Sequence, residues 1–222
     1  MANMNTMDKT LNVCEIFHSL QGESTRAGRR CSFVRLAGCN LRCAWCDTRY
    51  SFGEGRTLTL GMILEALRPY RSPLVEITGG EPLTQDATPE LAALLLREGY
   101  EVLVETNGSL DISPLPYPVG RIMDLKTPSS GMADRNHLPN LVHLRRGDEV
   151  KFIIADRMDY EWAKTMIAGA EYPADVVETL FSPAQGSLNA TQLAAWILDD
   201  KLNVRLNLQI HRFIWPDIDR GV

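Results

Sequence analysis

The sequence predicts an α/β protein built as an incomplete, TIM-like barrel of about six mostly parallel strands with crossover helices. Short apolar runs alternate with helical patterns along the chain, which is typical of parallel sheets whose strands are joined by helices. A complete eightfold barrel typically needs about 250 residues, whereas this chain has 222. We therefore expect an open barrel, formed by residues 1–222 as a single domain.

The predicted strands and helices follow one another in order. Apolar or alternating runs predict strands at residues 12–20, 31–36, 74–78, 100–105, 121–125, 150–155, 175–181 and 204–210. Helices are predicted at residues 59–67, 89–98, 156–168 and from Asn189 or Thr191 to Asp200. Pro69 stops the first helix and Asp156 caps the third. Other connections are too short or too rich in proline for a helix. Since ligands of such folds bind beyond the carboxyl ends of the strands, the candidate site residues are those just past the strand ends.

The composition is that of an ordinary globular protein with a modest acidic excess. Apolar residues make up 45% and charged residues 23%, which excludes fibrous, coiled-coil and disordered chains. The formal net charge of −5 argues against direct binding to nucleic acid, which usually needs a basic excess. No apolar run reaches the ~18 residues of a membrane helix, and residues 1–10 are too polar for a signal peptide. We expect a cytoplasmic protein without a membrane partner.

The cysteines are confined to the amino-terminal part of the chain, and three of them form a tight group. Cys39, Cys43 and Cys46 lie in the segment Cys-Asn-Leu-Arg-Cys-Ala-Trp-Cys. Cys14 and Cys31 fall within predicted strands and are expected in the core. Three thiolates at this spacing can bind one inorganic centre, and a four-iron cluster held by three of them keeps one iron open for another ligand.

The triplet resembles the cluster-binding signature of the radical S-adenosylmethionine (SAM) superfamily. The segment Thr78-Gly79-Gly80-Glu81-Pro82 follows a predicted strand and is similar to the superfamily's Gly-Gly-Glu-Pro motif. The resemblance implies a [4Fe–4S] cluster on the triplet, in a cluster loop of residues 38–48, with SAM on the open iron. It also implies an external electron donor of the flavodoxin or ferredoxin type. The residues that it assigns to SAM are Trp45, Cys46, Asp47, Gly80, Glu81, Asp124, Leu125, Lys126, Ser182 and Pro183.

Glu81 is expected to accept hydrogen bonds from the SAM ammonium group, a charge-assisted contact. The tripeptide Asp124-Leu125-Lys126 stands where many relatives carry Ser-Pro-Lys. The SAM contacts assigned to that tripeptide therefore depart from the usual pattern.

Further segments are similar to the 7-carboxy-7-deazaguanine synthase (QueE) family of that superfamily. They are residues 17–23 (Phe-His-Ser-Leu-Gln-Gly-Glu), 33–40, 46–48, 104–108 and 209–211, so the resemblance covers nearly the whole chain. It implies a lyase that converts 6-carboxy-5,6,7,8-tetrahydropterin to 7-carboxy-7-deazaguanine, in the deazapurine (queuosine precursor) pathway of tRNA modification. The ring is contracted, ammonia is released, SAM is used catalytically and Mg²⁺ assists. The resemblance also points to a homodimer.

Specific roles follow from the same resemblance. It assigns the pterin to Leu20, Gln21, Gly22, Glu23, Arg35, Thr78, Glu105 and His211. Arg35 is predicted to bind the substrate carboxylate, which a guanidinium fork suits. Glu105 is predicted to act as an acid–base group, His211 to contact the substrate, and Thr48 to bind Mg²⁺, which prefers oxygen ligands. Structural alternatives are a surface ion pair for Arg35, local amide bonds for Glu105 and simple burial for His211.

Two other functions remain open from the sequence. An activating enzyme that installs a glycyl radical on a partner protein would share the triplet and the length, but it has no use for Arg35 or residues 21–23. A non-enzymatic iron–sulfur or zinc module, with the zinc completed by Cys31 or His18, could sense redox state or bind RNA. The acidic balance argues against that module, and zinc sites usually add a second, distant cysteine pair that the sequence lacks.

Overall fold

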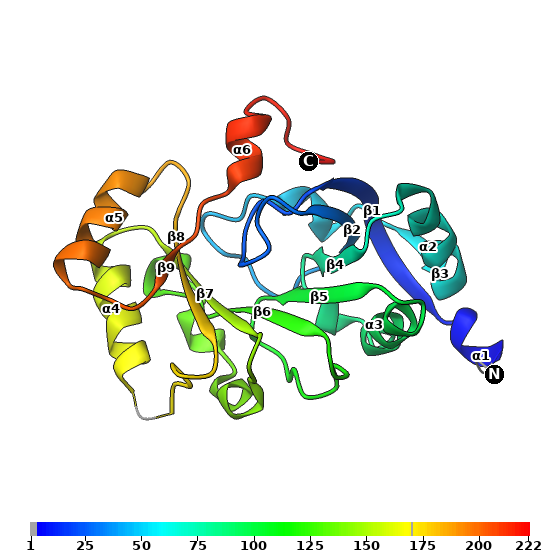
Figure 1. The fold of residues 1–222 in the computed structure, drawn as a ribbon, viewed down its shortest axis with the longest axis horizontal. Coiled ribbons are helices and arrows are strands. Elements are labelled where there is room, and N and C mark those ends of the chain that lie inside the picture. The colour runs from blue at the N-terminus through cyan, green and yellow to red at the C-terminus, as the bar shows by residue number, and fades with distance from the viewer. Residues whose placement is uncertain (1–3, 170) are drawn as a thin grey trace.

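The structure, a computed structural model, describes residues 4–169 and 171–222 and contains one large open sheet (Figure 1). Within those residues, nine strands form this sheet in the order β3-β1-β2-β4-β5-β6-β7-β8-β9. The strands are β1 (Thr10–Leu20), β2 (Arg30–Leu36), β3 (Arg56–Thr59), β4 (Leu74–Gly79), β5 (Glu101–Thr106), β6 (Gly120–Asp124), β7 (Glu149–Ile154), β8 (Glu178–Pro183) and β9 (Arg205–Leu206).

Most of the sheet is parallel, as the sequence predicts. Parallel pairings join β2 to β4 and then run strand by strand to β9. Only β1 is antiparallel to its neighbours, β2 and β3. The edge strands β3 and β9 do not pair with each other, so the barrel stays open. The predicted incomplete barrel is confirmed, with more strands than the six or so expected.

Four of the helices cross between neighbouring parallel strands or lead into them. They are α2 (Leu60–Leu67), α3 (Thr88–Arg97), α4 (Arg157–Ala168) and α5 (Ala190–Asp199); the short α1 (Met4–Met7) and α6 (Ile210–Ile214) lie near the two ends of the described chain. Figure 1 shows α2 and α3 beside one end of the sheet, α4 and α5 beside the other, and α6 apart from both pairs. Between β6 and β7 the chain forms only 3-10 turns, which confirms the expectation of connections without a helix. None of the helices in the described ranges is long and apolar enough to span a bilayer.

The predicted helix starts rest on side-chain caps. The Asp156 carboxylate accepts a hydrogen bond from the Asp159 N–H (2.9 Å), and the Asn189 side chain accepts one from the Thr191 N–H (2.7 Å). Each bond satisfies an amide that has no partner inside the helix. Both caps are readable in the sequence, which is why these helix boundaries were predictable.

The sequence analysis missed one strand and misplaced two strand boundaries by three or four residues. Strand β3 escaped prediction, because its four residues are too few to show a pattern. Strand β8 begins at Glu178 rather than 175, because the amides of Val176 and Val177 bond back to the Pro173 carbonyl in a turn (2.9 and 3.2 Å). The predicted strand 204–210 ends after Leu206. The Asn207 N–H still donates to the Phe181 carbonyl of β8 (2.9 Å), and its side chain bonds to the Ser182 hydroxyl and to the Ser24 N–H.

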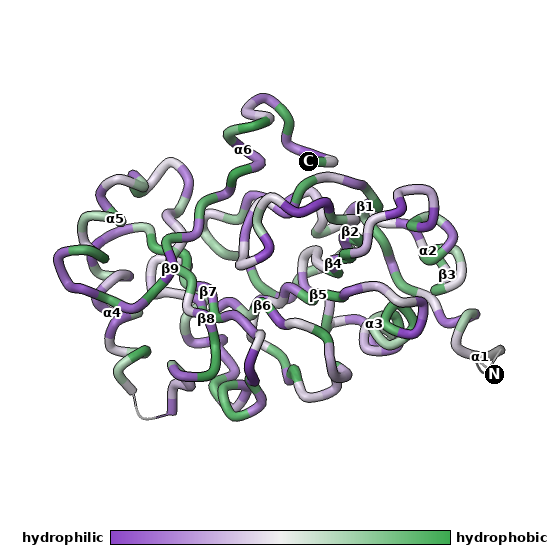
Figure 2. Tube along the Cα trace, in the orientation of Figure 1, coloured by the Kyte–Doolittle hydropathy of each residue, from purple (hydrophilic) through white to green (hydrophobic). Residues whose placement is uncertain are grey.

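The two faces of the sheet have different chemistry. Side chains that point outward pack with α2 to α5 in one large apolar core, which includes Val34, Ile77, Val104, Met123, Phe152 and Phe181. Side chains that point inward form a small apolar cluster near the strand starts, made of Phe17, Cys31, Phe33, Leu74, Leu103 and Ile122. Cys31 is fully buried there, as predicted, while Cys14 is half-buried. Figure 2 shows the hydrophobic and hydrophilic positions alternating along the helices that flank the sheet.

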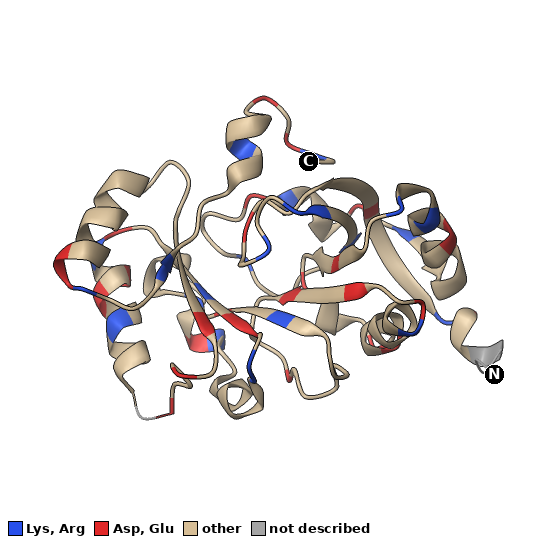
Figure 3. Ribbon diagram, in the orientation of Figure 1, with Lys and Arg blue, Asp and Glu red and all other residues tan. Residues whose placement is uncertain are grey.

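Polar residues follow the inner apolar cluster on the same strands. Since residues two apart share a face of a strand, Arg35 follows Phe33, Glu105 follows Leu103, and Asp124 follows Ile122 on the inside. Figure 3 shows charged positions of both signs on the central strands as well as on helices and loops. The inside of the open barrel is therefore apolar at one end and charged at the end where the parallel strands terminate.

Candidate active site

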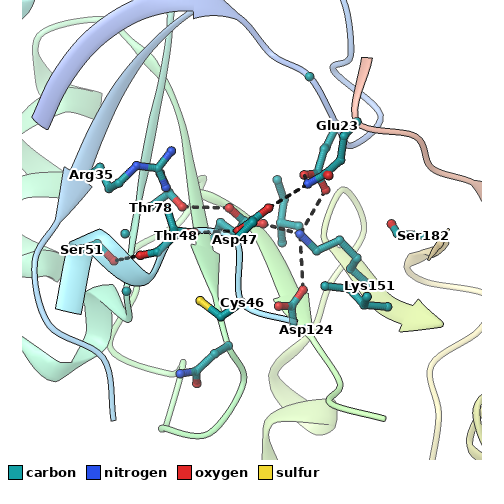
Figure 4. Close-up of a pocket in the computed structure, with 18 of the residues that line it drawn as sticks. Glu23, Arg35, Cys46, Asp47, Thr48, Ser51, Thr78, Asp124, Lys151 and Ser182 are labelled. Atoms are coloured by element: carbon teal, nitrogen blue, oxygen red, sulfur yellow. Dashed lines mark hydrogen bonds and ion pairs between the residues drawn. The ribbon is translucent and has the colours of Figure 1, made fainter. Parts of the chain in front are cut away.

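A pocket opens at the carboxyl ends of the parallel strands (Figure 4). It gathers nearly all the residues predicted from the sequence, from segments far apart in the chain. The predicted residues that line it are Leu20, Gln21, Gly22, Glu23, Arg35, Cys39, Cys43, Trp45, Cys46, Asp47, Thr48, Thr78, Gly80, Glu105, Asp124, Lys126, Ser182, Pro183 and His211. Glu81 and Leu125 are the two predicted site residues that do not line it.

The three cysteines of the cluster loop lie on one wall of the pocket. The Cys39 sulfur accepts hydrogen bonds from the Leu41 N–H (3.4 Å) and from the Asn107 side chain (3.7 Å), which follows β5. Burial raises the pKa of the Cys43 and Cys46 thiols. Sulfur donors of this kind fit an iron–sulfur cluster, in which each thiolate binds a separate iron. In the described part of the chain, no three His, Cys, Asp or Glu side chains lie close enough together to hold a single metal ion.

The glycine pair after β4 lies directly against the cluster loop. A Cβ atom on Gly80 would lie 2.1 Å from the Gly38 carbonyl oxygen and 2.8 Å from the Cys39 Cβ. The Gly80 N–H donates to the Leu36 carbonyl (3.1 Å), and the Glu81 N–H donates to the Gly38 carbonyl (2.8 Å). Only glycine allows this approach, so the pair sets the position of the loop that carries the cysteines.

Glu81, which is predicted to contact SAM, does not line the pocket. Its fully buried carboxylate accepts hydrogen bonds from the Leu83 N–H (2.9 Å), the Thr106 hydroxyl (2.8 Å) and the Asn107 N–H (2.6 Å). Burial raises its pKa to about 7 despite these bonds. Glu81 thus holds the segment whose Asn107 amide reaches the Cys39 sulfur.

Leu125 belongs to the apolar core that faces the helices. Its backbone N–H donates to the Lys151 carbonyl (2.9 Å). Its predicted role in binding SAM has no support from this position. Its neighbour Lys126 does face the pocket, where its ammonium pairs with the Asp124 carboxylate. The Asn136 side chain bonds both backbone groups of Lys126 (2.8 and 2.9 Å) and so holds it in place.

Arg35 presents part of its guanidinium to the pocket. Its Nε donates to the Glu15 carboxylate (2.7 Å), which also accepts from the Tyr50 hydroxyl (2.8 Å). Its guanidinium carbon lies 5.7 Å from the centre of the Phe17 ring and 6.0 Å from that of Tyr50. Among the described residues neither terminal nitrogen has a hydrogen-bond acceptor. Arg35 is thus a fixed cation whose outer edge is available to an anionic ligand.

A buried lysine that the sequence analysis missed joins the acidic residues of the pocket. The Lys151 Nζ pairs with the Glu105 carboxylate, lies 3.2 Å from a Glu23 oxygen and 3.5 Å from the Asp124 Oδ1. The other Glu105 oxygen accepts from the Thr78 hydroxyl (2.8 Å). Figure 4 shows Glu23, Lys151 and Asp124 converging from separate segments.

Glu76, also missed, is buried on the inner face of β4 and accepts a hydrogen bond from the Gln21 side-chain amide. Burial, followed by the charge of Glu105, raises the pKa of Glu76 well above its ordinary value. Burial also raises the pKa of Glu105, but the Lys151 ammonium, the Thr78 hydroxyl and the Arg35 charge together lower it by more, so the result is below the ordinary value. The pocket therefore holds one carboxyl that favours its proton and one that favours its charge. The available signal for both missed residues was a lone charge inside an apolar strand, in Leu-Val-Glu-Ile-Thr and Val-Lys-Phe-Ile-Ile.

The carboxy-terminal segment covers the pocket and holds His211 against Gly22. His211 lies in α6, and a Cβ atom on Gly22 would lie 1.9 Å from its Nδ1. Burial lowers the pKa of His211. The neighbouring Gln209 amide donates to Glu23 (2.8 Å) and to Asp47 (3.3 Å). This segment thereby connects the predicted pterin-binding residues to the cluster loop.

The last residues of the chain also reach the pocket, where Ile218, Asp219 and Val222 line it. Arg220 anchors them, because its guanidinium pairs with Glu54 (2.8 and 3.1 Å) and lies 3.9 Å from the centre of the Tyr50 ring. The sequence alone left the position of residues 215–222 open.

Thr48 and Asp47 provide adjacent oxygen atoms at the edge of the cluster loop. The Thr48 hydroxyl donates to the Asp47 carboxylate (2.8 Å), and both residues line the pocket. Hydroxyl and carboxylate oxygens are donors of the kind that Mg²⁺ accepts, usually with water or substrate oxygens completing the shell. The chemistry of these donors fits the predicted ion.

Comparisons with known proteins agree with this geometry. Residues 33–117 match the family model of the radical SAM superfamily. The chain is 42% identical to the 7-carboxy-7-deazaguanine synthase of Koribacter versatilis, over 96% of this chain and 100% of the relative. It is 41% identical to that of Chlorobaculum tepidum, over 96% and 97%. In fold it resembles the crystal structure of QueE from Escherichia coli, with a TM-score of 0.73, 22% identity and coverage of 94% and 99%.

The contact between the glycine pair and the cluster loop can be tested with Gly80→Ala. The added methyl group would displace Gly38 and Cys39. We expect the affinity for the cluster to fall about 10- to 100-fold, the usual effect of disturbing groups that position metal ligands. The iron and sulfide content of the protein after anaerobic reconstitution measures this loss of cluster binding. Gly53→Ala is the matched control, because its φ is −131° and its Cβ would meet no atom within 4 Å. Full cluster content in Gly80→Ala would contradict this account.

Proposed function

The chain belongs to the 7-carboxy-7-deazaguanine synthase family of radical SAM enzymes, and we propose how its residues divide that reaction among them. The enzyme forms 7-carboxy-7-deazaguanine, with a [4Fe–4S] cluster and SAM as the cofactors of its superfamily. We propose 6-carboxy-5,6,7,8-tetrahydropterin as the substrate, converted by ring contraction with release of ammonia. The observation that supports this most is that one pocket unites the cluster loop with Arg35 and the segment 20–23.

On the cofactor side, Cys39, Cys43 and Cys46 would hold the cluster. The bound cluster and SAM supply the hydrogen-atom abstraction that starts the rearrangement. The remaining residues assigned to SAM that line the pocket are Trp45, Asp47, Gly80, Asp124, Lys126, Ser182 and Pro183. The Ser182 hydroxyl is already oriented, because it accepts a hydrogen bond from the Asn207 side chain (2.8 Å).

On the substrate side, the free edge of the Arg35 guanidinium would bind the pterin carboxylate in bidentate fashion. Glu105 is ionised by its ion pair with Lys151 and can accept a proton during the losses that follow ring contraction. The pterin ring would be contacted by Leu20, Gln21, Gly22, Glu23 and Thr78. His211 of α6 would close the pocket.

Thr48 would supply a protein oxygen to Mg²⁺, with substrate oxygens and water completing the coordination. The adjacent Asp47 carboxylate lies within hydrogen-bonding distance of that hydroxyl and adds negative charge. The ion would neutralise negative charge on the substrate where the cluster loop meets the pterin site.

We infer further properties that the pocket alone does not decide. Residues 1–222 form a single radical SAM core domain, since one sheet includes every described strand. An external flavodoxin- or ferredoxin-type donor reduces the cluster, in the cytoplasm, where three free thiols stay reduced. The product enters queuosine synthesis for tRNA, and the enzyme is a homodimer. Light scattering at micromolar concentration tests the dimer, which a strictly monomeric mass would refute.

The comparisons favour neither of the two alternative functions that the sequence left open. The relatives that match nearly the whole chain carry the synthase name, so a glycyl-radical activating enzyme or a non-enzymatic iron–sulfur or zinc module has no specific support.

Anaerobic turnover tests the reaction directly. With reconstituted cluster, SAM, Mg²⁺, a strong reductant and 6-carboxytetrahydropterin, we expect 7-carboxy-7-deazaguanine in excess of the SAM consumed, as detected by mass spectrometry. Cys43→Ala should abolish it, while Cys14→Ser, outside the pocket, should preserve it. Chelation of Mg²⁺ should lower the rate. Cleavage of SAM without any deazaguanine would show that radical chemistry is present but the substrate is wrong.

Arg35→Lys tests recognition of the substrate carboxylate. A lysine cannot make two parallel hydrogen bonds to a carboxylate. We expect KM for the pterin to rise about 10- to 100-fold, since a hydrogen bond to a charged group contributes roughly 1.5–3 kcal/mol. SAM cleavage without pterin should change little. Arg97→Lys, at an exposed position in the last turn of α3, is the control. An unchanged KM would remove Arg35 from the substrate site.

A further inference from the structure

Lys151 is assigned no direct contact with cofactor or substrate, yet three carboxylates of the pocket surround its ammonium. It lies in the middle of β7 with its side chain inside the barrel and only 4% of the residue exposed. The neighbours Val150 and Phe152 point to the opposite, apolar face. A lone ammonium in such a position requires paired charges, because burial of an unpaired one is strongly unfavourable.

The three carboxylates around Lys151 come from different parts of the pocket. Glu105, at the end of β5, and Glu23, in the loop after β1, belong to the substrate side. Asp124, at the end of β6, belongs to the SAM side, and its Oδ1 accepts no hydrogen bond in the described structure but lies 3.5 Å from the ammonium. One side chain therefore touches both halves of the pocket.

We propose that Lys151 is a positioning residue that fixes Glu105 and Glu23 for the pterin and couples them to the SAM side through Asp124. This inference rests on the proposed function, because it gives those carboxylates their roles. Lys151 itself need not touch the substrate. It acts through the orientation and the charge of the groups that do.

The charges around Glu105 explain why one lysine has this effect. Glu105 accepts a hydrogen bond from Thr78 and lies among charged and titratable groups from several elements. They are Glu76 on β4, Lys151 on β7, Asp124 on β6, Arg35 on β2, Glu23 in the loop after β1 and His211 in α6. Lys151 is the cation in direct contact with Glu105. Without it, Glu105 would remain half-buried among other carboxyls, and like charges and partial burial both favour the protonated form.

The direction of the pH effect follows from this arrangement. The Lys151 ammonium lowers the pKa of Glu105, so the wild-type carboxylate keeps its charge to a lower pH than it would without the lysine. Burial lowers the pKa of Lys151, but Asp124, Glu105 and Glu23 together raise it by more. The ammonium therefore stays charged at every pH at which Glu105 titrates. Loss of the ammonium therefore raises the pKa of Glu105 and moves the acid limb of the pH–rate profile to higher pH.

A structural ion pair is the competing explanation, and it makes a different prediction. A buried ion pair can be replaced by apolar groups with little loss of stability. If Lys151 served packing alone, a neutral side chain of similar length would change the unfolding temperature but leave the pH profile in place.

Lys151→Met and Lys151→Arg separate these explanations, with Lys164→Met as the matched control. Lys164 is a lysine of α4 that pairs with Asp200 and Glu161, away from the pocket. For Lys151→Met we expect kcat/KM for the pterin to fall about 100-fold, within the usual range for an acid–base group, and the acid limb to move up by about one pH unit. SAM cleavage without pterin should persist. Lys151→Arg should keep the acid limb of the pH–rate profile at its wild-type position. Lys164→Met should match the wild type in kcat/KM and in the pH–rate profile.

Several outcomes overturn the proposal. One is a folded Lys151→Met enzyme with the acid limb at its wild-type position, and another is a Lys151→Arg enzyme with the limb shifted as in Lys151→Met. If Lys151→Met does not fold, Lys151→Gln takes its place, and an acid limb that stays at its wild-type position in that variant overturns the proposal. If the wild type forms no deazaguanine, the proposed function fails and this inference with it. If the wild type turns over and the profile of Lys151→Met is unshifted, only this inference fails.

Discussion

The ion cluster around the buried Lys151 ammonium is the constraint on which the interior of this barrel depends. Removing an ion from water costs several kcal/mol unless the charge is compensated. Compensation here comes from Glu23, Glu105 and Asp124, so the loop after β1, β5 and β6 must all present a carboxylate to β7. The same carboxylates line the pocket. The side chains that compensate the buried ammonium therefore also form part of the pocket wall.

The alternation of side chains along the strands makes this possible. Outward positions such as Val104 and Phe152 form the apolar core with the helices, and the positions between them face inward. Near the strand starts the inward positions are apolar and close that end, with Phe17 and Phe33 stacked at 4.7 Å. Toward the strand ends they are charged. An open barrel can keep charges there because bound ligands and loops, rather than further strands, complete the enclosure.

Loop contacts then complete the site at two points where there is no room for a side chain. Gly80 contacts the loop that carries the cysteines, and Gly22 contacts His211 of α6. The glycine pair of the first contact was visible in the sequence as part of a motif, but the contact with the cluster loop was not. The second joins residues remote in sequence, and nothing near Gly22 shows that a histidine from α6 will pack on it. Glu81 is a different case. Its carboxylate is predicted to contact SAM, but it does not line the pocket, and it accepts hydrogen bonds from the Leu83 and Asn107 N–H groups.

What the sequence by itself determined was local: the thiol triplet, the glycine pair, the helix caps at Asp156 and Asn189, and the strand ends that carry Arg35, Glu105 and Asp124. Each of these depends on spacing within a few residues or on the period of one element. Tertiary structure alone decided which buried polar groups meet, namely Lys151 with its three carboxylates and Glu76 with the Gln21 amide. It also decided that the chain leaves the sheet at Asn207 to cover the pocket. Pairing of buried charges is a property of several strands in register, and the period of a single strand shows that a residue points inward but not what it will face.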